Sequence, residues 1–174
     1  MIPDIKLKPK LVVDTSFWIN IVSLGLEKYL IDVFELYIVS KVEKEILDES
    51  EYKLYDSEDM EIFNIYKSKG IIRVKNPINI SKKLIDNLQI DSGELYSIAL
   101  VMESNLIIAT DDGGAIEFWE SNNINLMNSV KFILYLFDKK KINLDFAKSY
   151  LTRLVGKIKL KYIKFGVNYL NTKM

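Results

Sequence analysis

Short apolar runs alternate along the whole chain with longer segments in which polar and apolar positions are mixed. A short apolar run that is bounded by polar or turn-forming residues is typical of a strand buried on both faces. Pro77 stops one such run, because proline cannot donate a hydrogen bond to a neighbouring strand. The runs predict strands at residues 11–13, 35–40, 71–77, 105–110 and 124–127.

The segments between these runs have the spacing of helices. In one of them, four apolar residues follow the spacing i, i+3, i+4 and i+7 and predict a buried stripe: Leu95, Ile98, Ala99 and Met102. Thr15 or Ser16 can cap the first helix, and Gly70 can end the third. Helices are predicted at residues 23–34, 41–49, 56–69, 91–103, 113–123, 129–138 and 143–155.

The alternation of strands with helices predicts an α/β fold in which helices cover both faces of a parallel sheet. We expect one domain over residues 1–174, with 139–174 as a basic helical extension packed on it. In such sheets the ligand crevice lies beyond the carboxyl ends of the strands. Asp14 and the pair Asp111-Asp112 directly follow two predicted strands, so we expect their side chains to converge.

The chain contains neither cysteine nor histidine. Disulfides, thiol nucleophiles, imidazole bases and zinc sites built from these residues are therefore excluded. Any chemistry must use carboxylates, hydroxyls, lysines or a bound cofactor. No apolar run approaches the roughly 20 residues that a membrane-spanning helix needs. The first ten residues also lack the apolar segment of a secretory signal, so we expect a cytoplasmic protein.

The net charge is zero, but the charges are unevenly distributed. Residues 139–174 contain ten Lys or Arg and one acidic residue, whereas the part of the chain before them is acidic. A basic tail on an acidic body suggests an anionic partner for one end and cation binding in the other. The alternative is an ordinary solvated face. Three aromatic residues of the tail predict a stripe that faces the core or a partner, and we favour the core: Tyr162, Phe165 and Tyr169.

Several acidic residues lie near the predicted carboxyl edge of the sheet. Asp111 and Asp112 place two like charges beside a core, which is unfavourable unless a cation is present. Each acid alone has a structural explanation, because Asp14 can cap a helix, Asp112 can form an Asp-Gly turn, and Asp91 with Glu94 fits a capping box. Together, carboxylates and hydroxyls without imidazole suit Mg²⁺ or Mn²⁺.

The predicted helix at 41–49 carries two further acids. Val42 and Ile46 are expected to face the core. Glu43 and Glu45 both lie about 80° from that direction on a helical wheel, so the wheel does not choose between them. Either one can also be a solvated surface acid.

Four segments resemble the PIN-domain nucleases: "LVVDTS" with Asp14, "VSKVEKEIL" with an acid on the helix, "DSGELYSIAL" with Glu94, and "LIIATDDGGA". The last two are most similar to the PIN subgroup with a Gly-Glu helix start and a Thr-Asp-Asp turn. "INLMNSVKFIL" continues the match, with Ser129 where that subgroup usually has Thr. Two places depart from it, since residues 128–131 replace a small Gly-Thr-x-Gly loop and Gly113-Gly114 follow the Asp pair.

The resemblance implies a three-layer α/β/α sandwich with a central, mostly parallel sheet, and Mg²⁺- or Mn²⁺-dependent cleavage of single-stranded RNA. Many members are toxins of toxin–antitoxin pairs, which implies a protein antitoxin as a partner and also a homodimer. Carried over by position, the catalytic quartet is Asp14, Glu45, Glu94 and Asp112, with the metal held by Asp14, Glu94 and Asp112. Family spacing is the only reason to prefer Glu45 to Glu43.

The resemblance also implies supporting residues around this quartet. Asp111 and Asp91 would be auxiliary acids, and the hydroxyls of Ser16 and Thr110 would orient carboxylates or water. Basic side chains would neutralise RNA phosphates without reading the base sequence. The candidates for this role are Lys131, Lys157, Lys159 and Lys161.

Two other functions fit parts of the pattern. A phosphatase with an aspartyl nucleophile is disfavoured, because "VVDTS" lacks the second Asp two residues after the first. A PIN-like fold without activity would serve as a binding or assembly module, and the four filled acidic positions argue against it. Stabilisation by Mn²⁺ distinguishes the enzyme from the module, since an inactive module need not bind the ion.

Overall fold

The computed structural model describes residues 8–47, 58–80, 92–121 and 124–173. At its centre is a five-stranded sheet in the order β3-β2-β1-β4-β5, in which all neighbouring strands run parallel. The sequence prediction of a parallel sheet is therefore confirmed. The strands are β1 (Lys10–Val13), β2 (Glu35–Ile38), β3 (Ile72–Val74), β4 (Ile107–Ala109) and β5 (Leu126–Met127).

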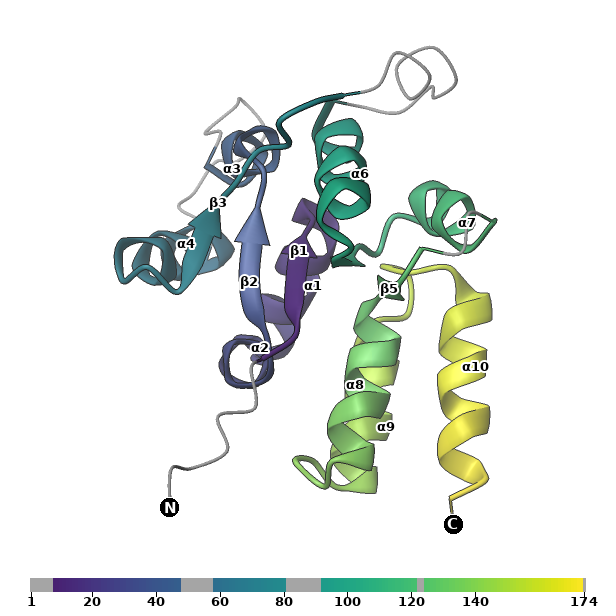
Figure 1. Cartoon of the computed structure of the whole chain (residues 1–174). Helices are drawn as coiled ribbons and strands as arrows, with labels where there is room; N and C mark the ends of the chain where they lie inside the picture. The colour runs from purple at the N-terminus through teal and green to yellow at the C-terminus, as the bar shows by residue number, and fades with distance from the viewer. Residues whose placement is uncertain (1–7, 48–57, 81–91, 122–123, 174) are drawn as a thin grey trace, which may run out of the picture.

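Helices on both faces of the sheet complete a three-layer α/β/α sandwich, as predicted. Figure 1 shows α1 (Thr15–Leu24) behind the sheet and α6 (Ser92–Ser104) in front of it. The sheet core is apolar, with Leu11, Val12 and Ile108 almost fully buried. The other helices are α2 (Glu27–Val33), α3 (Ser40–Leu47), α4 (Glu58–Ser68), α7 (Gly113–Ser121), α8 (Ser129–Asp138), α9 (Leu144–Arg153) and α10 (Leu160–Asn171).

The first helix differs from the prediction. It begins at Thr15, not at residue 23, and of the three caps that the sequence offers, Asp14, Thr15 and Ser16, the N-cap is Asp14. Gly25, with φ of 72°, ends it in the left-handed conformation that favours glycine, and α2 follows as a separate helix. The periodic signal is weak in α1 because its buried residues surround most of the helix: Phe17, Trp18, Asn20, Ile21, Val22 and Leu24.

Two residues expected in the core are exposed. Met102 in α6 is 58% exposed, whereas Ile98 and Ala99 of the same predicted stripe are buried, as is Val101. Phe165 in α10 is 56% exposed, so the predicted core-facing aromatic stripe is wrong at this position, although Tyr162 is buried. The predictions for Val42 and Ile46 are confirmed, since both side chains are fully buried.

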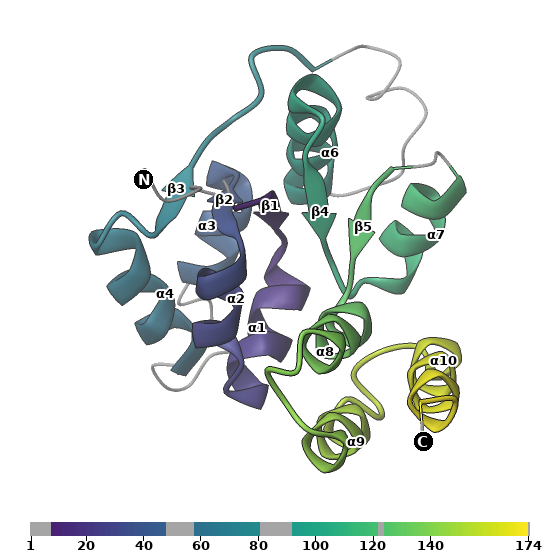
Figure 2. The same ribbon diagram turned by 60° about the horizontal axis from the view of Figure 1, so that its bottom comes forward.

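The basic C-terminal part packs as helices against the rest of the chain. Helices α8, α9 and α10 contact one another, and Figure 2 shows them side by side and nearly end-on. At Gly166 of α10 an added Cβ would lie 2.9 Å from Cγ1 of Val130 and 3.0 Å from Cδ1 of Leu151, so the helices approach closely there. Among the described helices, none has the length and apolar character needed to cross a membrane.

Candidate carboxylate site

The strand order brings the ends of β1 and β4 together. These two strands are neighbours, although the chain forms β2 and β3 between them, so the winding of the sheet reverses direction at this point. In open α/β sheets the ligand crevice lies at such a reversal, beyond the carboxyl ends of the strands. The backbone N–H of Asp14 donates to the carbonyl oxygen of Ala109 at 2.9 Å. Asp14 therefore lies beside the residues that follow β4, as the sequence predicts.

The Asp14 side chain connects the two strand ends. It is 8% exposed, and its Oδ2 accepts hydrogen bonds from the hydroxyls of Ser16 (2.7 Å) and Thr110 (3.0 Å). Each hydroxyl also accepts a backbone N–H, from Asp111 to Ser16 Oγ (3.0 Å) and from Asp112 to Thr110 Oγ1 (3.1 Å). A hydroxyl can donate one hydrogen bond and accept others at the same time. Each of these two hydroxyls therefore accepts a backbone N–H while its own proton is donated to the Asp14 carboxylate. This is the orienting role predicted for Ser16 and Thr110.

Asp111 is a second buried carboxylate, and it joins two helices to the end of β4. Its side chain is 5% exposed. Oδ1 accepts the backbone N–H of Ser129 at 2.8 Å, and Oδ2 accepts the Ser129 hydroxyl and the Asn20 amide, the latter at 2.9 Å. Ser129 begins α8 and Asn20 lies in α1. Because both carboxylate oxygens of Asp111 already accept hydrogen bonds, this residue is suited to positioning α1 and α8 relative to the end of β4.

Burial raises the pKa of both carboxyls above the usual value, because the charged form loses its hydration. The hydrogen bonds oppose this rise at both residues, and the charge of Asp14 adds to it at Asp111. Among the described residues, neither carboxylate is paired with Lys or Arg. Two nearby buried carboxylates with hydroxyl and amide neighbours fit the preference of Mg²⁺ and Mn²⁺ for hard oxygen ligands.

Asp112 is exposed and directly precedes α7. Its Oδ1 accepts the backbone N–H groups of Gly114 (2.8 Å) and Ala115 (2.9 Å), and its carbonyl accepts that of Ile116 (2.9 Å). This is the turn-and-cap role that the sequence offers as the alternative to a metal ligand. Both side-chain bonds use Oδ1, so this structural role and a ligand role for Oδ2 are compatible.

The contacts of α3 separate its two acidic candidates. Glu45 Oε2 accepts a hydrogen bond of 2.7 Å from the hydroxyl of Thr15, the residue next to Asp14. Glu43 instead forms an ion pair with Lys67 of α4. The helical wheel leaves the choice open, whereas in the tertiary structure Glu45 contacts the residue next to Asp14 and Glu43 does not.

Two further acids were predicted for this site, Glu94 and Asp91. Glu94 lies half-buried in the first turn of α6, a helix that packs against α3. Asp91 falls outside the described residues. Over the described ranges, acidic side chains form no group of three or more that is placed to hold a metal ion. The ligand set of Asp14, Glu94 and Asp112 therefore stays a prediction.

One of the predicted RNA-binding lysines lies beside Asp112. Lys159 Nζ donates to the carbonyl oxygen of Gly113 at 3.1 Å, and its side chain occupies the space where a Cβ of Gly113 would be. Lys157 Nζ donates to the Ser23 hydroxyl at 3.0 Å, near the end of α1. The remaining two lie elsewhere, with the Lys131 ammonium 3.4 Å from the Leu126 carbonyl and that of Lys161 above the Tyr162 ring.

Sequence reasoning missed two polar residues of the site. Asn20 bonds to Asp111, and its presence inside the apolar stretch "FWINIV" is a signal that points to a buried polar contact. Thr15 was expected only as a helix cap, yet its hydroxyl bonds to Glu45 across 30 positions of the sequence. Nothing in the local sequence indicates that contact, because it depends on how α3 packs against α1.

Comparison of the chain with protein-family models and with curated protein sequences finds no match to either. The functional argument therefore depends on the motifs, the fold and the geometry of the carboxylate site.

Proposed function

We propose that this chain is a metal-dependent endoribonuclease of the PIN type, which hydrolyses the phosphodiester bonds of single-stranded RNA in the cytoplasm. The observation that supports this most is the buried pair Asp14 and Asp111 at the reversal point of the sheet, for which the described residues supply no basic partner. The order of the PIN-like motifs supports the reaction class. The proposal includes the role of a toxin, with a protein antitoxin and a second copy of the chain as partners.

Asp14, Glu94 and Asp112 are the proposed ligands of one or two Mg²⁺ or Mn²⁺ ions. When bound, such ions lower the pKa of a water molecule and offset charge on the phosphoryl oxygens. The hydroxyls of Ser16 and Thr110 hold the Asp14 carboxylate in one orientation. Asp111 in turn connects Asn20 inside α1 with the start of α8. These contacts preorganise the carboxylates before any substrate binds.

The C-terminal extension supplies the proposed contacts to the RNA backbone. Lys159 lies against Gly113, directly after Asp112, so its ammonium stands at the rim of the carboxylate site. Lys157 and Arg153 reach Ser23 at the end of α1, the Arg153 guanidinium donating to its carbonyl oxygen. One cation next to Asp112 and two more at the far end of α1 suit a substrate that is itself a polyanion. These contacts would favour RNA of any base sequence.

The test is cleavage of an end-labelled single-stranded RNA in Mn²⁺, Mg²⁺ or EDTA. We expect cleavage with either ion and none in EDTA. A variant that lacks a site carboxylate is run beside the wild type, since equal cleavage by both would identify a contaminating nuclease. Cleavage that persists in EDTA would contradict a metal-dependent reaction.

An inactive binding or assembly module is the second candidate, favoured by the lack of a three-carboxylate group among the described residues. The two functions differ in their response to the ion. For the nuclease we expect Mn²⁺ to raise the melting temperature of the wild type. No such shift, together with no cleavage of RNA, would favour the module.

Replacement of Glu45 tests the preference for Glu45 over Glu43 in α3. We expect Glu45→Gln to reduce RNA cleavage by about 10- to 100-fold, because this carboxylate accepts a hydrogen bond from Thr15, the residue next to Asp14. Glu43→Gln is the matched control, with the same chemical change on the same helix. It should retain wild-type cleavage and lose only the ion pair with Lys67. The opposite ranking of the two variants would contradict the assignment of Glu45.

Gly113 provides a test of where the Lys159 charge must lie. A Cβ at Gly113 would be 2.2 Å from Cε and 2.7 Å from Cδ of Lys159, so an alanine would displace this flexible side chain. We expect Gly113→Ala and Lys159→Gln each to raise KM for RNA by about tenfold, the value of one charged contact. Both should leave the melting temperature nearly unchanged.

Lys69→Gln, at an exposed position after α4, is the control for the loss of one positive charge. If Lys159→Gln alone raises KM, the charge matters but its position against Gly113 does not. If neither variant raises KM, Lys159 has no role in RNA binding.

A further inference from the structure

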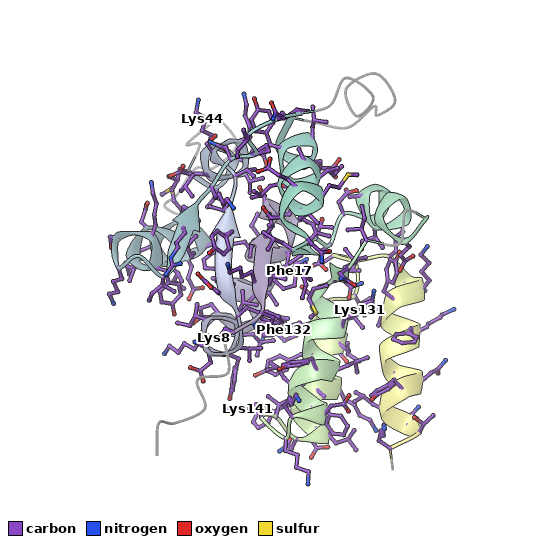
Figure 3. The ribbon with its side chains drawn as sticks, in the orientation of Figure 1. Lys8, Phe17, Lys44, Lys131, Phe132 and Lys141 are labelled. Carbon is purple, nitrogen blue, oxygen red and sulfur yellow. The ribbon has the colours of Figure 1, made fainter. Side chains whose placement is uncertain are left out.

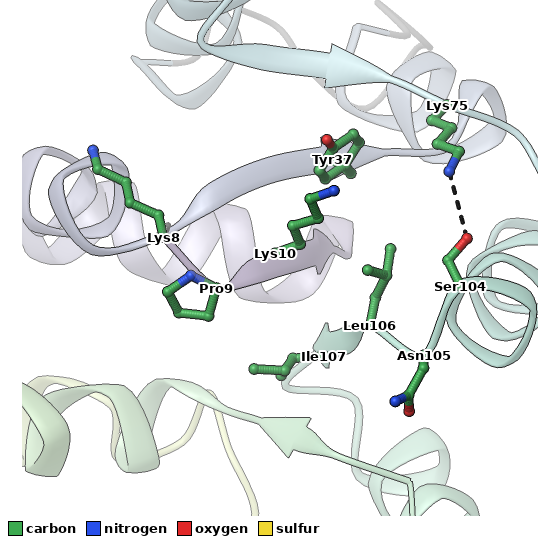
Figure 4. Close-up of a pocket in the computed structure, with 9 residues that line it drawn as sticks. All are labelled: Lys8, Pro9, Lys10, Tyr37, Lys75, Ser104, Asn105, Leu106 and Ile107. Carbon is green, nitrogen blue, oxygen red and sulfur yellow. Dashed lines mark hydrogen bonds between the residues drawn. The ribbon is translucent and has the colours of Figure 1, made fainter. Parts of the chain in front are cut away.

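A hollow lies apart from the carboxylate site and shares no residue with it. Its volume is about 460 Å³, and its walls come from the start of β1, from β2, from the end of β3 and from the turn between α6 and β4. Pockets of roughly 300–1,000 Å³ commonly hold small molecules. Figure 4 shows the residues that line it: Lys8, Pro9, Lys10, Tyr37, Lys75, Ser104, Asn105, Leu106 and Ile107.

The lining is basic. It contains three lysines and no acidic residue. In Figure 4 the ammonium groups of Lys10 and Lys75 lie on the same side as Tyr37 and Ser104, whereas that of Lys8 points away and donates to the Ile31 carbonyl. Two cations on one side of a hollow favour a ligand with negative charge.

The contacts of these two lysines leave donors for a ligand. Lys10 Nζ lies 5.9 Å from the centre of the Tyr37 ring, and Lys75 Nζ is 3.4 Å from the Ser104 hydroxyl. Neither forms an ion pair with an acid among the described residues. The nearest acid on β2, Glu35, accepts from the Tyr37 hydroxyl and is paired with Arg73. Its charge is therefore already offset.

The rest of the lining is suited to an organic group. Leu106 and Ile107 supply apolar side chains, and in Figure 4 the Lys10 side chain lies between them and the Tyr37 ring. The side chains of Ser104 and Asn105 add uncharged polar groups at one end. This combination of apolar side chains, an aromatic ring and two cations matches a molecule with a ring system and a phosphate.

We propose that this hollow is a binding site for a mononucleotide-sized organic phosphate, with the phosphate held by Lys10 and Lys75. The phosphate would lie between the two ammonium groups and the Ser104 hydroxyl, and the organic part would lie against Leu106. The same chemistry occurs in a free nucleotide and at the phosphorylated end of an RNA strand. Because its residues are separate from the carboxylate site, this binding does not depend on nuclease activity.

The experiment is isothermal titration calorimetry of the full chain with AMP, adenosine, citrate and a 5′-phosphorylated oligonucleotide. EDTA is present throughout to prevent metal-dependent RNA cleavage. We expect AMP to bind and adenosine not to bind, and Lys10→Gln and Lys75→Gln each to weaken AMP by about tenfold. Lys164→Gln, on the exposed side of α10, should bind AMP as the wild type does. Tighter binding of the oligonucleotide than of AMP would identify an RNA end as the source of the phosphate.

Three results would overturn the site. Adenosine binding as tightly as AMP would show that the phosphate is not recognised. Citrate binding as tightly as AMP would show a nonspecific response to anions. Equal weakening by Lys164→Gln would show that overall charge is measured instead of this hollow. Circular dichroism of each variant separates a lost site from a lost fold.

Discussion

Replacement of Asp14 by Asn is expected to lower kcat/KM for RNA cleavage by more than about 100-fold, because changes of residues that only support a metal ligand already reduce activity 10- to 100-fold. Asn has the same shape, and its carbonyl oxygen can still accept from the hydroxyls of Ser16 and Thr110. The loss would therefore come from the missing charge. Asp32→Asn, at an exposed position of α2, removes the same charge elsewhere and should cleave RNA as the wild type does.

The same variant is expected to be more stable than the wild type in EDTA at neutral pH. Burial raises the pKa of Asp14 above its usual value of 3.8, so the folded protein binds this proton more tightly than the unfolded chain. Wild-type stability then falls as the pH rises from the unfolded pKa to the folded one, and the penalty persists above it. Asn carries no charge, so the variant avoids the penalty.

The measurement is urea unfolding of Asp14→Asn and the wild type between pH 4 and pH 7.5. We expect the difference in the free energy of unfolding to increase with pH and then to level off. A variant that is inactive and also less stable at every pH would show that Asp14 supports the fold more than the chemistry. A variant that remains active would contradict the proposed function.

The largest loss of stability is expected from Phe132→Ala. Phe132 of α8 is fully buried, with its ring 6.3 Å from that of Phe17 and 6.2 Å from that of Phe34. Figure 3 shows the Phe17 and Phe132 side chains where α8 meets the sheet. Removal of a fully buried phenylalanine ring leaves a cavity and lowers the free energy of unfolding by about 3–5 kcal/mol.

Phe165→Ala is the matched control, because Phe165 is 56% exposed on α10. Surface substitutions usually change stability by less than about 0.5 kcal/mol. Urea unfolding of both variants at one pH gives the comparison. A loss at Phe165 as large as that at Phe132 would mean that the Phe165 side chain is buried, as the sequence stripe predicts, and not exposed as in the structure.

The sequence by itself determined the local structure and the chemistry that is available. The apolar run Leu11–Val13 marked β1, because a strand buried on both faces has few polar positions. The acids after β1 and β4 were identifiable, since the carboxyl ends of parallel strands share one edge of the sheet. The absence of histidine and cysteine restricted the chemistry to carboxylates, hydroxyls, lysines or a bound cofactor. Local patterns failed where a helix is buried on several sides, as in α1.

The tertiary structure alone decided which side chains meet. The order β3-β2-β1-β4-β5 made β1 and β4 neighbours, and local propensities carry no information about that pairing. The packing of α3 placed Glu45 in hydrogen-bond contact with Thr15 and Glu43 in an ion pair with Lys67, although both acids are equivalent on a helical wheel. Contacts of this kind join residues far apart in the chain, so they depend on how whole elements pack and not on the sequence near each residue.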